Sequence, residues 1–159
     1  MTSNHEVTII TPCYNGESYI EPYINGLLSQ TYTNVEYIFV NDGSTDKTEE
    51  IILSYKQQFI DKGWTFTYLK QENKGQASAI NNGLKIMTGE FFSCVDSDDI
   101  LYPTYIEEML NLLKQNPDYA ICFPWAEMYD QKTNKIIREF KRKVAPRVQD
   151  NLFVLKCAK

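Results

Sequence analysis

Long hydrophobic runs and paired cysteines are both missing from this sequence, and each absence excludes a class of protein. No stretch approaches the roughly 18 apolar residues that a membrane-spanning helix needs, and the first residues, MTSNHE, lack the basic start and apolar segment of a signal peptide. The four cysteines are widely spaced without a Cys-x-x-Cys pair, which fits neither a zinc site nor a dense disulfide framework. We therefore expect a cytoplasmic protein with reduced cysteines, three of which lie in apolar runs typical of a core: Cys13, Cys94 and Cys122.

Positive charge is scarce over most of the chain. Residues 1–131 carry 19 acidic and 7 basic side chains, a net charge of −12, whereas residues 132–159 carry 9 basic and 2 acidic side chains, a net charge of +7. Because affinity for a phosphate backbone depends on Lys and Arg, the acidic body argues against a nucleic-acid binder. No Gly-x-Gly-x-x-Gly turn or Gly-x-x-x-x-Gly-Lys loop follows an expected strand, which argues against a dinucleotide or flavin oxidoreductase.

The chain does contain enough apolar material for a core, and its segments alternate regularly between strand-like and helix-like patterns. Its 159 residues, 43% of them hydrophobic, fit one globular domain. Apolar and β-branched runs predict strands at residues 7–12, 35–40, 65–69, 91–95 and about 119–125. Apolar stripes at helical spacing predict helices at residues 18–30, about 46–59, 75–87 and about 105–113, and a hairpin is expected around residues 130–134. This alternation predicts an α/β fold with a mostly parallel sheet and helices on both faces.

Three polar loops follow expected strands, and in such a sheet they meet at its carboxyl edge, where ligands bind. They are TPCYNGE at residues 11–17, NDGSTD at residues 41–46 and DSDD at residues 96–99. The second loop is equally well explained as a turn with a helix cap. The third crowds three carboxylates into four residues, which is costly unless a cation neutralises them. A magnesium or manganese site that also holds substrate phosphates is one interpretation, and a solvated acidic loop is the other.

In their order and spacing, the segments TPCYNGE, VNDGSTD, NKGQASAINNG and VDSDD resemble the N-terminal half of family 2 glycosyltransferases. The resemblance covers about residues 7–125. It implies a Rossmann-like GT-A fold and a sugar transfer with inversion from a nucleotide diphosphate-sugar, commonly a UDP-sugar, with Mn2+ or Mg2+ as cofactor. Many relatives build cell-envelope polysaccharides on lipid carriers, so the resemblance also implies a saccharide or lipid-linked acceptor.

The resemblance assigns roles to residues of the first two loops. Pro12 and Tyr14 would line the pocket for the base and the ribose, with Glu17 just behind them. Asp42 would accept a hydrogen bond from the base, commonly uracil in this family.

The other two segments also receive roles from the resemblance. Lys74 and Gly75 would lie close to the base, although Lys74 is also explained as an ordinary surface lysine. Asp96 and Ser97 would face the ribose, and Asp98 would bind the metal that bridges the diphosphate. A divalent cation held there would stabilise the negative charge of the departing diphosphate.

An inverting transfer also needs a base that deprotonates the acceptor hydroxyl. The only histidine, His5, precedes the first strand, so we expect a carboxylate in this role. The family carries it in an acidic pair well after the Asp-x-Asp loop, and no such pair follows that loop in a suitable place. We therefore expect residues 1–131 to be a nucleotide-sugar-binding region, residues 132–159 to begin an acceptor half that is truncated, and the catalytic base to be absent. The alternative is a non-catalytic nucleotide-binding or scaffolding module.

Two further features each allow two interpretations. The basic tail is either a solvated strand and linker or a contact for an anionic membrane surface, which would place the protein at the inner face of the membrane. Trp64 and Trp125 lie in or beside apolar runs, where core packing is the simpler explanation, but Trp125 at a strand end could face the sugar or the acceptor. The residues that make the tail basic include Arg138, Lys141, Arg142, Lys143 and Arg147.

Overall fold

The structure is a computed structural model that describes residues 5–124, 126–130, 133 and 135–140. The chain divides into two units, Met1–Ile106 and Glu107–Lys159. The first unit holds a four-stranded parallel sheet with its helices, and the second holds a two-stranded antiparallel hairpin. The predicted boundary at residue 131 rests on charge alone and stays a prediction. Trp125 and most of the basic tail lie outside the described residues.

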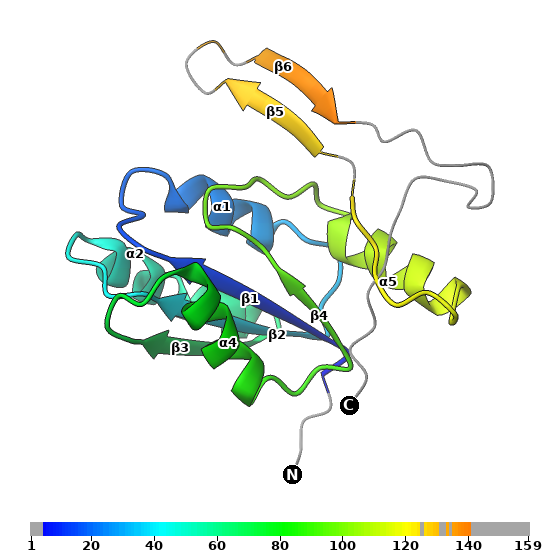
Figure 1. The fold of residues 1–159 in the computed structure, drawn as a ribbon, viewed down its shortest axis with the longest axis horizontal. Helices are drawn as coiled ribbons and strands as arrows, with labels where there is room; N and C mark the ends of the chain where they lie inside the picture. The colour runs from blue at the N-terminus through cyan, green and yellow to red at the C-terminus, as the bar shows by residue number, and fades with distance from the viewer. Residues whose placement is uncertain (1–4, 125, 131–132, 134, 141–159) are drawn as a thin grey trace. The chain divides into compact units, whose positions relative to one another are not determined.

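The parallel sheet consists of β1 (Val7–Cys13), β2 (Val35–Asn41), β3 (Thr65–Lys70) and β4 (Phe91–Cys94) in the order β3-β2-β1-β4 (Figure 1). All residues of the two central strands are buried, whereas the edge strands β3 and β4 are only partly covered. Continuous apolar runs are typical of parallel strands that are covered on both faces. The four-strand pattern predicted for this part of the chain is therefore confirmed.

Four helices connect these strands: α1 (Ile20–Leu28), α2 (Thr48–Ser54), α3 (Lys56–Asp61) and α4 (Gln76–Ile86). The chain steps from β1 to β2 to β3 in one direction and then returns past them to β4. Since such crossovers are right-handed, α4 lies on the opposite face of the sheet from the other three helices. Figure 1 shows α4 lying across one face of β1 and β2.

Alternate residues of β2 pack against these two helical layers. Ile38 belongs to a buried cluster with Ile10 of β1 and Ala79 of α4. The neighbouring residue, Tyr37, points to the other face, where its ring centroid lies 4.8 Å from that of Phe59 in α3. Full burial of side chains of this size contributes roughly 1.5–3 kcal/mol each. Helices on both faces of the sheet are thus confirmed.

Pro12 lies within β1, although it was predicted to end that strand. Val95 N donates a hydrogen bond to Ile10 O, and Asp42 N donates one to Cys13 O. The backbone N–H and C=O groups of even-numbered residues of β1 therefore point towards β4, and those of odd-numbered residues point towards β2. The pairing with β4 ends at Ile10. Because the missing N–H of Pro12 would point beyond that last pair, the proline removes no hydrogen bond from the sheet.

The second unit contains most of α5 (Tyr105–Gln115) and the hairpin of β5 (Ala126–Asp130) and β6 (Lys135–Phe140). The register shifts between Met128 and Tyr129, which marks an irregularity in the pairing. The predicted hairpin is therefore confirmed. Among the described residues, no helix is long and apolar enough to cross a membrane.

Three other predictions need correction. Residues 119–124 form no regular strand, although Ile121 is half-buried and the Cys122 Sγ lies 3.5 Å from Met109 O of α5. An apolar run of that length does not fix the backbone conformation, and this one is only partly buried, with Phe123 exposed. The single helix predicted to about residue 59 is broken at Tyr55 into α2 and α3, because Tyr55 N donates to Ile52 O in a tightened turn. Cys94 is exposed because β4 is an edge strand.

Candidate functional site

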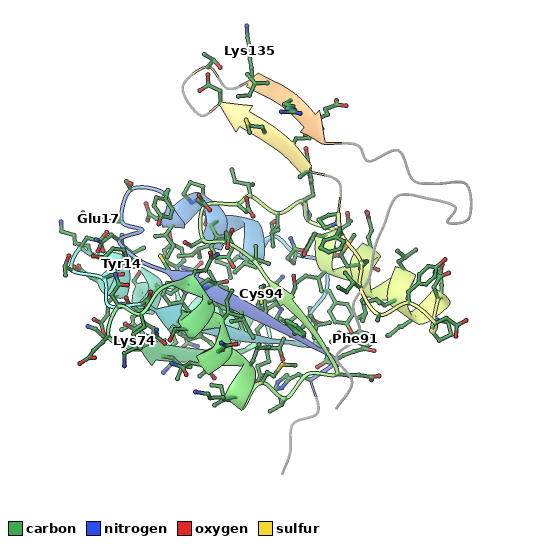
Figure 2. The ribbon with its side chains drawn as sticks, viewed as in Figure 1. Tyr14, Glu17, Lys74, Phe91, Cys94 and Lys135 are labelled. Carbon is green, nitrogen blue, oxygen red and sulfur yellow. The ribbon has the colours of Figure 1, made fainter. Side chains whose placement is uncertain are left out.

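The carboxyl ends of the four parallel strands lead into four polar segments of the first unit. These segments follow β1, β2, β3 and β4 at residues 14–17, 42–47, 71–75 and 95–99. Figure 2 shows Tyr14, Glu17 and Lys74 at one end of the sheet, and Phe91, the first residue of β4, at the other end. The sheet therefore brings the predicted loops to the edge where α/β proteins bind ligands.

Hydrogen bonds join the loop after β1 to the loop after β2. Asn15 has a φ of 53°, which is a left-handed conformation that Asn tolerates better than most residues. Its N donates to Ser44 Oγ at 3.0 Å, and its Oδ1 accepts from Thr45 N at 2.9 Å. Gly16 N donates to Thr48 Oγ1 at 2.7 Å. The two loops therefore fix each other before any ligand is considered.

Glu17 contributes to this connection through its carboxylate. Glu17 N donates to Asp46 Oδ2 at 2.9 Å, and Glu17 Oε2 accepts from Lys47 N at 3.2 Å, just before α2 begins. Asp46 also accepts from Thr48 N at 3.0 Å, which joins it to the first residue of α2. Burial acts to raise the pKa of Asp46, but hydrogen bonds from the Thr48 hydroxyl and from backbone N–H groups hold it below its usual value. The structure thus gives Glu17 a contact with the start of α2.

The two residues predicted to line the base pocket differ in exposure. Pro12 is buried within β1, whereas the side chain of Tyr14, two residues further on, is 47% exposed. The backbone oxygen of Tyr14 accepts a hydrogen bond from the Tyr19 hydroxyl at 3.3 Å. Of the two, Tyr14 has the aromatic surface that a flat ligand could contact.

Asp42 is 3% exposed and binds the segment that follows β3. Its Oδ1 accepts from Gln71 Nε2 at 2.7 Å and from Lys74 N at 2.9 Å, and its Oδ2 accepts from Gly75 N at 2.9 Å. Its own N donates to Cys13 O at 2.8 Å, which ties it to the end of β1. The Asp42 carboxylate therefore joins the segment after β2 to the segment after β3, and its backbone N joins both to the end of β1.

Lys74 and Gly75 meet Asp42 through their backbones. The ammonium group of Lys74 lies 3.7 Å from Glu72, and both side chains are mostly exposed. Gly75 precedes the first residue of α4 with a φ of 86°, a conformation that glycine adopts without strain. The Asp42 carboxylate thus lies at the amino end of α4, where the helix dipole favours negative charge.

The segment after β4 makes contacts of two kinds. Asp96 Oδ1 accepts a hydrogen bond from Gln76 Nε2 in the first turn of α4. Ser97 is buried, and its hydroxyl interacts with the Cys13 thiol and the Tyr19 hydroxyl, so it packs beneath the first loop. Burial raises the pKa of that Cys13 thiol.

The remaining two acidic residues lie at the surface. Asp98 and Asp99 are exposed, and the pKa of Asp99 is raised by partial burial and by the charges of Asp96 and Asp98. Both neighbouring carboxylates therefore disfavour the ionised form of Asp99. In the described part of the chain, no three His, Cys, Asp or Glu side chains converge to enclose a metal ion. A single exposed carboxylate such as Asp98 suits an ion whose other ligands are substrate phosphates and water.

Three residues that organise this site were not predicted from the sequence. Asn15, Gln71 and Gln76 each hydrogen-bond another polar segment through the side chain. The pair Asn15-Gly16 is a turn signal that could have revealed the first of them. Neither glutamine carries such a signal, because its partner is about 20 or more residues away in sequence.

The order of the strands and the helices on both faces define an α/β fold whose carboxyl edge carries four polar segments. Residues 8–154 match the family described as "Glycosyl transferase family 2". The chain belongs to this family, as the sequence resemblance implied.

Two solved structures and one relative show the extent of this similarity. An uncharacterized glycosyltransferase of Rickettsia typhi is 45% identical over 132 residues, which cover 82% of this chain and 39% of the relative. Residues 1–349 of TarS of S. aureus, solved in complex with UDP-GlcNAc, match with a TM-score of 0.63 and 29% identity over 70% of this chain and 32% of that one.

The second solved structure comes from another organism. The mannosyltransferase PcManGT of Pyrobaculum calidifontis, in complex with GDP-Man and Mn2+, matches with a TM-score of 0.63 and 27% identity over 77% of this chain and 36% of that one. The chain therefore spans between about a third and two fifths of the length of the three chains compared.

Proposed function

We propose that this chain binds the donor, most simply a UDP-sugar, of a glycosyltransferase that transfers the sugar with inversion. The observation that carries this proposal is the hydrogen bonding of Asp42. Three of the roughly four lone-pair positions of this carboxylate are filled by Gln71, Lys74 and Gly75, and Oδ2 keeps one position for another donor.

This geometry favours bases that offer a ring N–H. Uracil carries a hydrogen on N3, whereas N3 of cytosine is an acceptor that a carboxylate would repel. Guanine also has a ring N–H, so Asp42 alone does not separate uracil from guanine. The exposed ring of Tyr14, on the adjacent loop, offers a surface on which the base or ribose could pack. Support for uridine comes from TarS, whose structure was solved with UDP-GlcNAc.

The metal belongs to the same proposal. Asp98 would hold Mn2+ or Mg2+ together with the diphosphate, and the ion would stabilise the charge that develops on the departing group. Asp96 and Asp98 create a negative potential that would attract a cation; together with burial, which is the larger cause, their charges raise the pKa of Asp99. The presence of Mn2+ in the PcManGT structure supports this assignment. Asp96 and Ser97 would lie towards the ribose, with Ser97 fixed from below by Cys13 and Tyr19.

The acceptor side of the reaction completes the proposal. The base that deprotonates the acceptor hydroxyl would be a carboxylate in the portion of the relatives that this chain does not span. The acceptor would be a saccharide or a lipid-linked saccharide of the cell envelope, and the basic tail would contact the inner face of the membrane. We accordingly expect the 159-residue chain to bind the donor and to transfer sugar poorly.

Calorimetric titration of UDP tests the proposal directly. UDP is titrated into the chain with and without Mn2+, and into the variants Asp98→Ala and Asp61→Ala. Asp61 is a matched control, because it lies on α3 and bonds only locally to Gln57 among the contacts found for its carboxylate. We expect tight binding only with Mn2+, a loss of at least tenfold for Asp98→Ala, and no change for Asp61→Ala.

Two outcomes would contradict the proposal. The first is that the folded wild-type chain binds no UDP with Mn2+ present. The second is that Asp98→Ala binds UDP as tightly as Asp61→Ala does, which would remove the metal from the site. Titration with CDP checks the role of Asp42, and we expect it to bind at least tenfold more weakly than UDP.

A further inference from the structure

Gln71 lies at the centre of a set of hydrogen bonds behind Asp42. Its N donates to Asn41 O at 3.0 Å, so its backbone extends the pairing of β3 with β2 by one residue. Its side-chain Nε2 donates to Asp42 Oδ1 at 2.7 Å and lies 3.4 Å from Ser78 Oγ, while its Oε1 accepts from Asn82 Nδ2. The amide of this half-buried side chain is therefore held on three sides.

These bonds form a chain with one direction of donation. Lys85 Nζ donates to Asn82 Oδ1 at 2.8 Å, Asn82 donates to Gln71, and Gln71 donates to Asp42. An ammonium group at one end can only donate, and a carboxylate at the other end can only accept. Both amides between them are thereby fixed in a single orientation, with an N–H of Gln71 directed at Asp42.

We propose that Gln71 is a positioning residue for nucleobase recognition, because its amide holds the Asp42 carboxylate in the orientation that leaves one Oδ2 position for a ring N–H of the base. This inference rests on the proposed function, which gives Asp42 its contact with the base. Gln71 itself does not touch the ligand. It acts by filling the Oδ1 positions together with Lys74 N, so that the carboxylate cannot rotate without losing both bonds.

The backbone and the side chain of Gln71 have different contacts, so the positioning role of the side chain can be tested without disturbing the sheet. The backbone of Gln71 already joins β3 to β2, so a change confined to the side-chain amide leaves the sheet pairing intact. The substitution Gln71→Glu makes such a change, since it preserves the shape and removes the donor. It also places a second carboxyl group against Asp42, and two carboxyls so close share a proton.

The test is the affinity of the 159-residue chain for UDP with Mn2+, measured from about pH 5 to pH 8 and expressed relative to wild type at each pH. A matched control exists in Gln57→Glu. Gln57 Nε2 donates to the carboxylate of Asp61 at 2.8 Å on α3, so the control makes the same chemical change beside another carboxylate. Lys85, Lys74 and Glu72, the charged groups that flank or join the hydrogen-bond set, are unchanged in both variants.

We expect Gln71→Glu to weaken UDP binding at least tenfold at pH 8 and to recover part of that loss towards pH 5. Recovery follows because the shared proton supplies an O–H donor in place of the lost N–H. Gln57→Glu should match wild type at every pH. If Gln71→Glu fails to fold, Asn82→Ala takes its place. Asn82 lies on α4 and donates the hydrogen bond that orients Gln71, so we expect its loss to weaken UDP binding severalfold.

The outcomes separate the two proposals. Wild-type affinity in Gln71→Glu at all pH values, or in Asn82→Ala if that variant has to be used, overturns the inference alone. A loss in Gln71→Glu that does not change with pH also overturns it, because the loss would then reflect disrupted packing. If the folded wild-type chain binds no UDP, the proposed function is wrong and the inference falls with it.

Discussion

Gly83 sets the distance between α4 and the sheet, and the substitution Gly83→Ala tests this packing. A β-carbon at this position would lie 2.6 Å from Cγ2 of Ile10, closer than any ordinary contact between carbon atoms. Ile10 is fully buried in β1, and its β-branched side chain has few alternative rotamers. Overpacking of this kind costs typically about 1–3 kcal/mol, and the gain from alanine over glycine in a helix is about 1 kcal/mol. The difference between these two effects is a net loss of up to about 2 kcal/mol.

Urea unfolding followed by circular dichroism measures this loss, with two further variants as controls. Asn81→Ala changes an exposed position of the same helix, so it should be neutral or slightly stabilising. Ile10→Ala creates a cavity and is itself destabilising by about 2–5 kcal/mol. In the double variant the new β-carbon enters that cavity, so Gly83→Ala should cost at least about 1 kcal/mol less there than in the wild-type background.

The sign of the Gly83→Ala effect decides whether the close packing matters. If this variant is more stable than wild type, α4 moves away from β1 at little cost and the close packing is not required. If the cost is the same with and without Ile10→Ala, the clash is with some other group. Either result would refute the role of Gly83 in setting the distance between α4 and β1.

Two further predictions concern the joined loops after β1 and β2. Asn15→Ala should be less stable than Asn15→Gly by about 1 kcal/mol in urea unfolding. Both variants lose the hydrogen bond from Thr45 N, but only alanine is strained at a φ of 53°. Equal stabilities of the two variants would contradict this prediction. Folding lowers the pKa of Asp46, so its ionised carboxylate stabilises the folded protein. This stabilisation is fully present above the pKa of the unfolded state, about 3.9, and is lost as the pH falls through the pKa of the folded state. The difference in free energy of unfolding between wild type and Asp46→Asn should therefore be largest near neutral pH and shrink towards about pH 2. A difference that does not change with pH would contradict this role of Asp46.

Much of the first unit could be predicted because its strands are continuous apolar runs and its helices have regular apolar stripes. Ile38 and Val40 alternate with Tyr37 and Phe39 in β2, and all four are apolar because helices cover both faces. The strand expected at residues 119–125 shows where such patterns fail. This apolar run is only partly buried, since Phe123 is 53% exposed, and strand formation also requires a partner that the sequence does not reveal.

The site was predictable at the level of loops and not at the level of contacts. A parallel sheet must bring the loops of Tyr14, Asp42 and Asp98 to one edge, and the alternation of elements was enough to predict this. The contact of Asp42 with Gln71, in contrast, joins residues that are 29 positions apart. The sequence predicted that Lys74 lies close to the base or at the surface, but it did not predict that the backbone N of Lys74 binds Asp42. Such pairs depend on the exact register and turn geometry of the folded chain.

Asp46 and Asp99 show that the two ends of the site have opposite effects on stability. The pKa of Asp46 is lowered, so its ionised form stabilises the fold at neutral pH. The pKa of Asp99 is raised by burial and by Asp96 and Asp98, so at a pH above that value its ionised form destabilises the fold. Hydrogen bonds thus hold Asp46 in its ionised form and join the loops around it, whereas burial and the neighbouring charges disfavour the ionised form of Asp99. The segment after β4 therefore contributes less to the stability of the fold at neutral pH than the loop after β2 does.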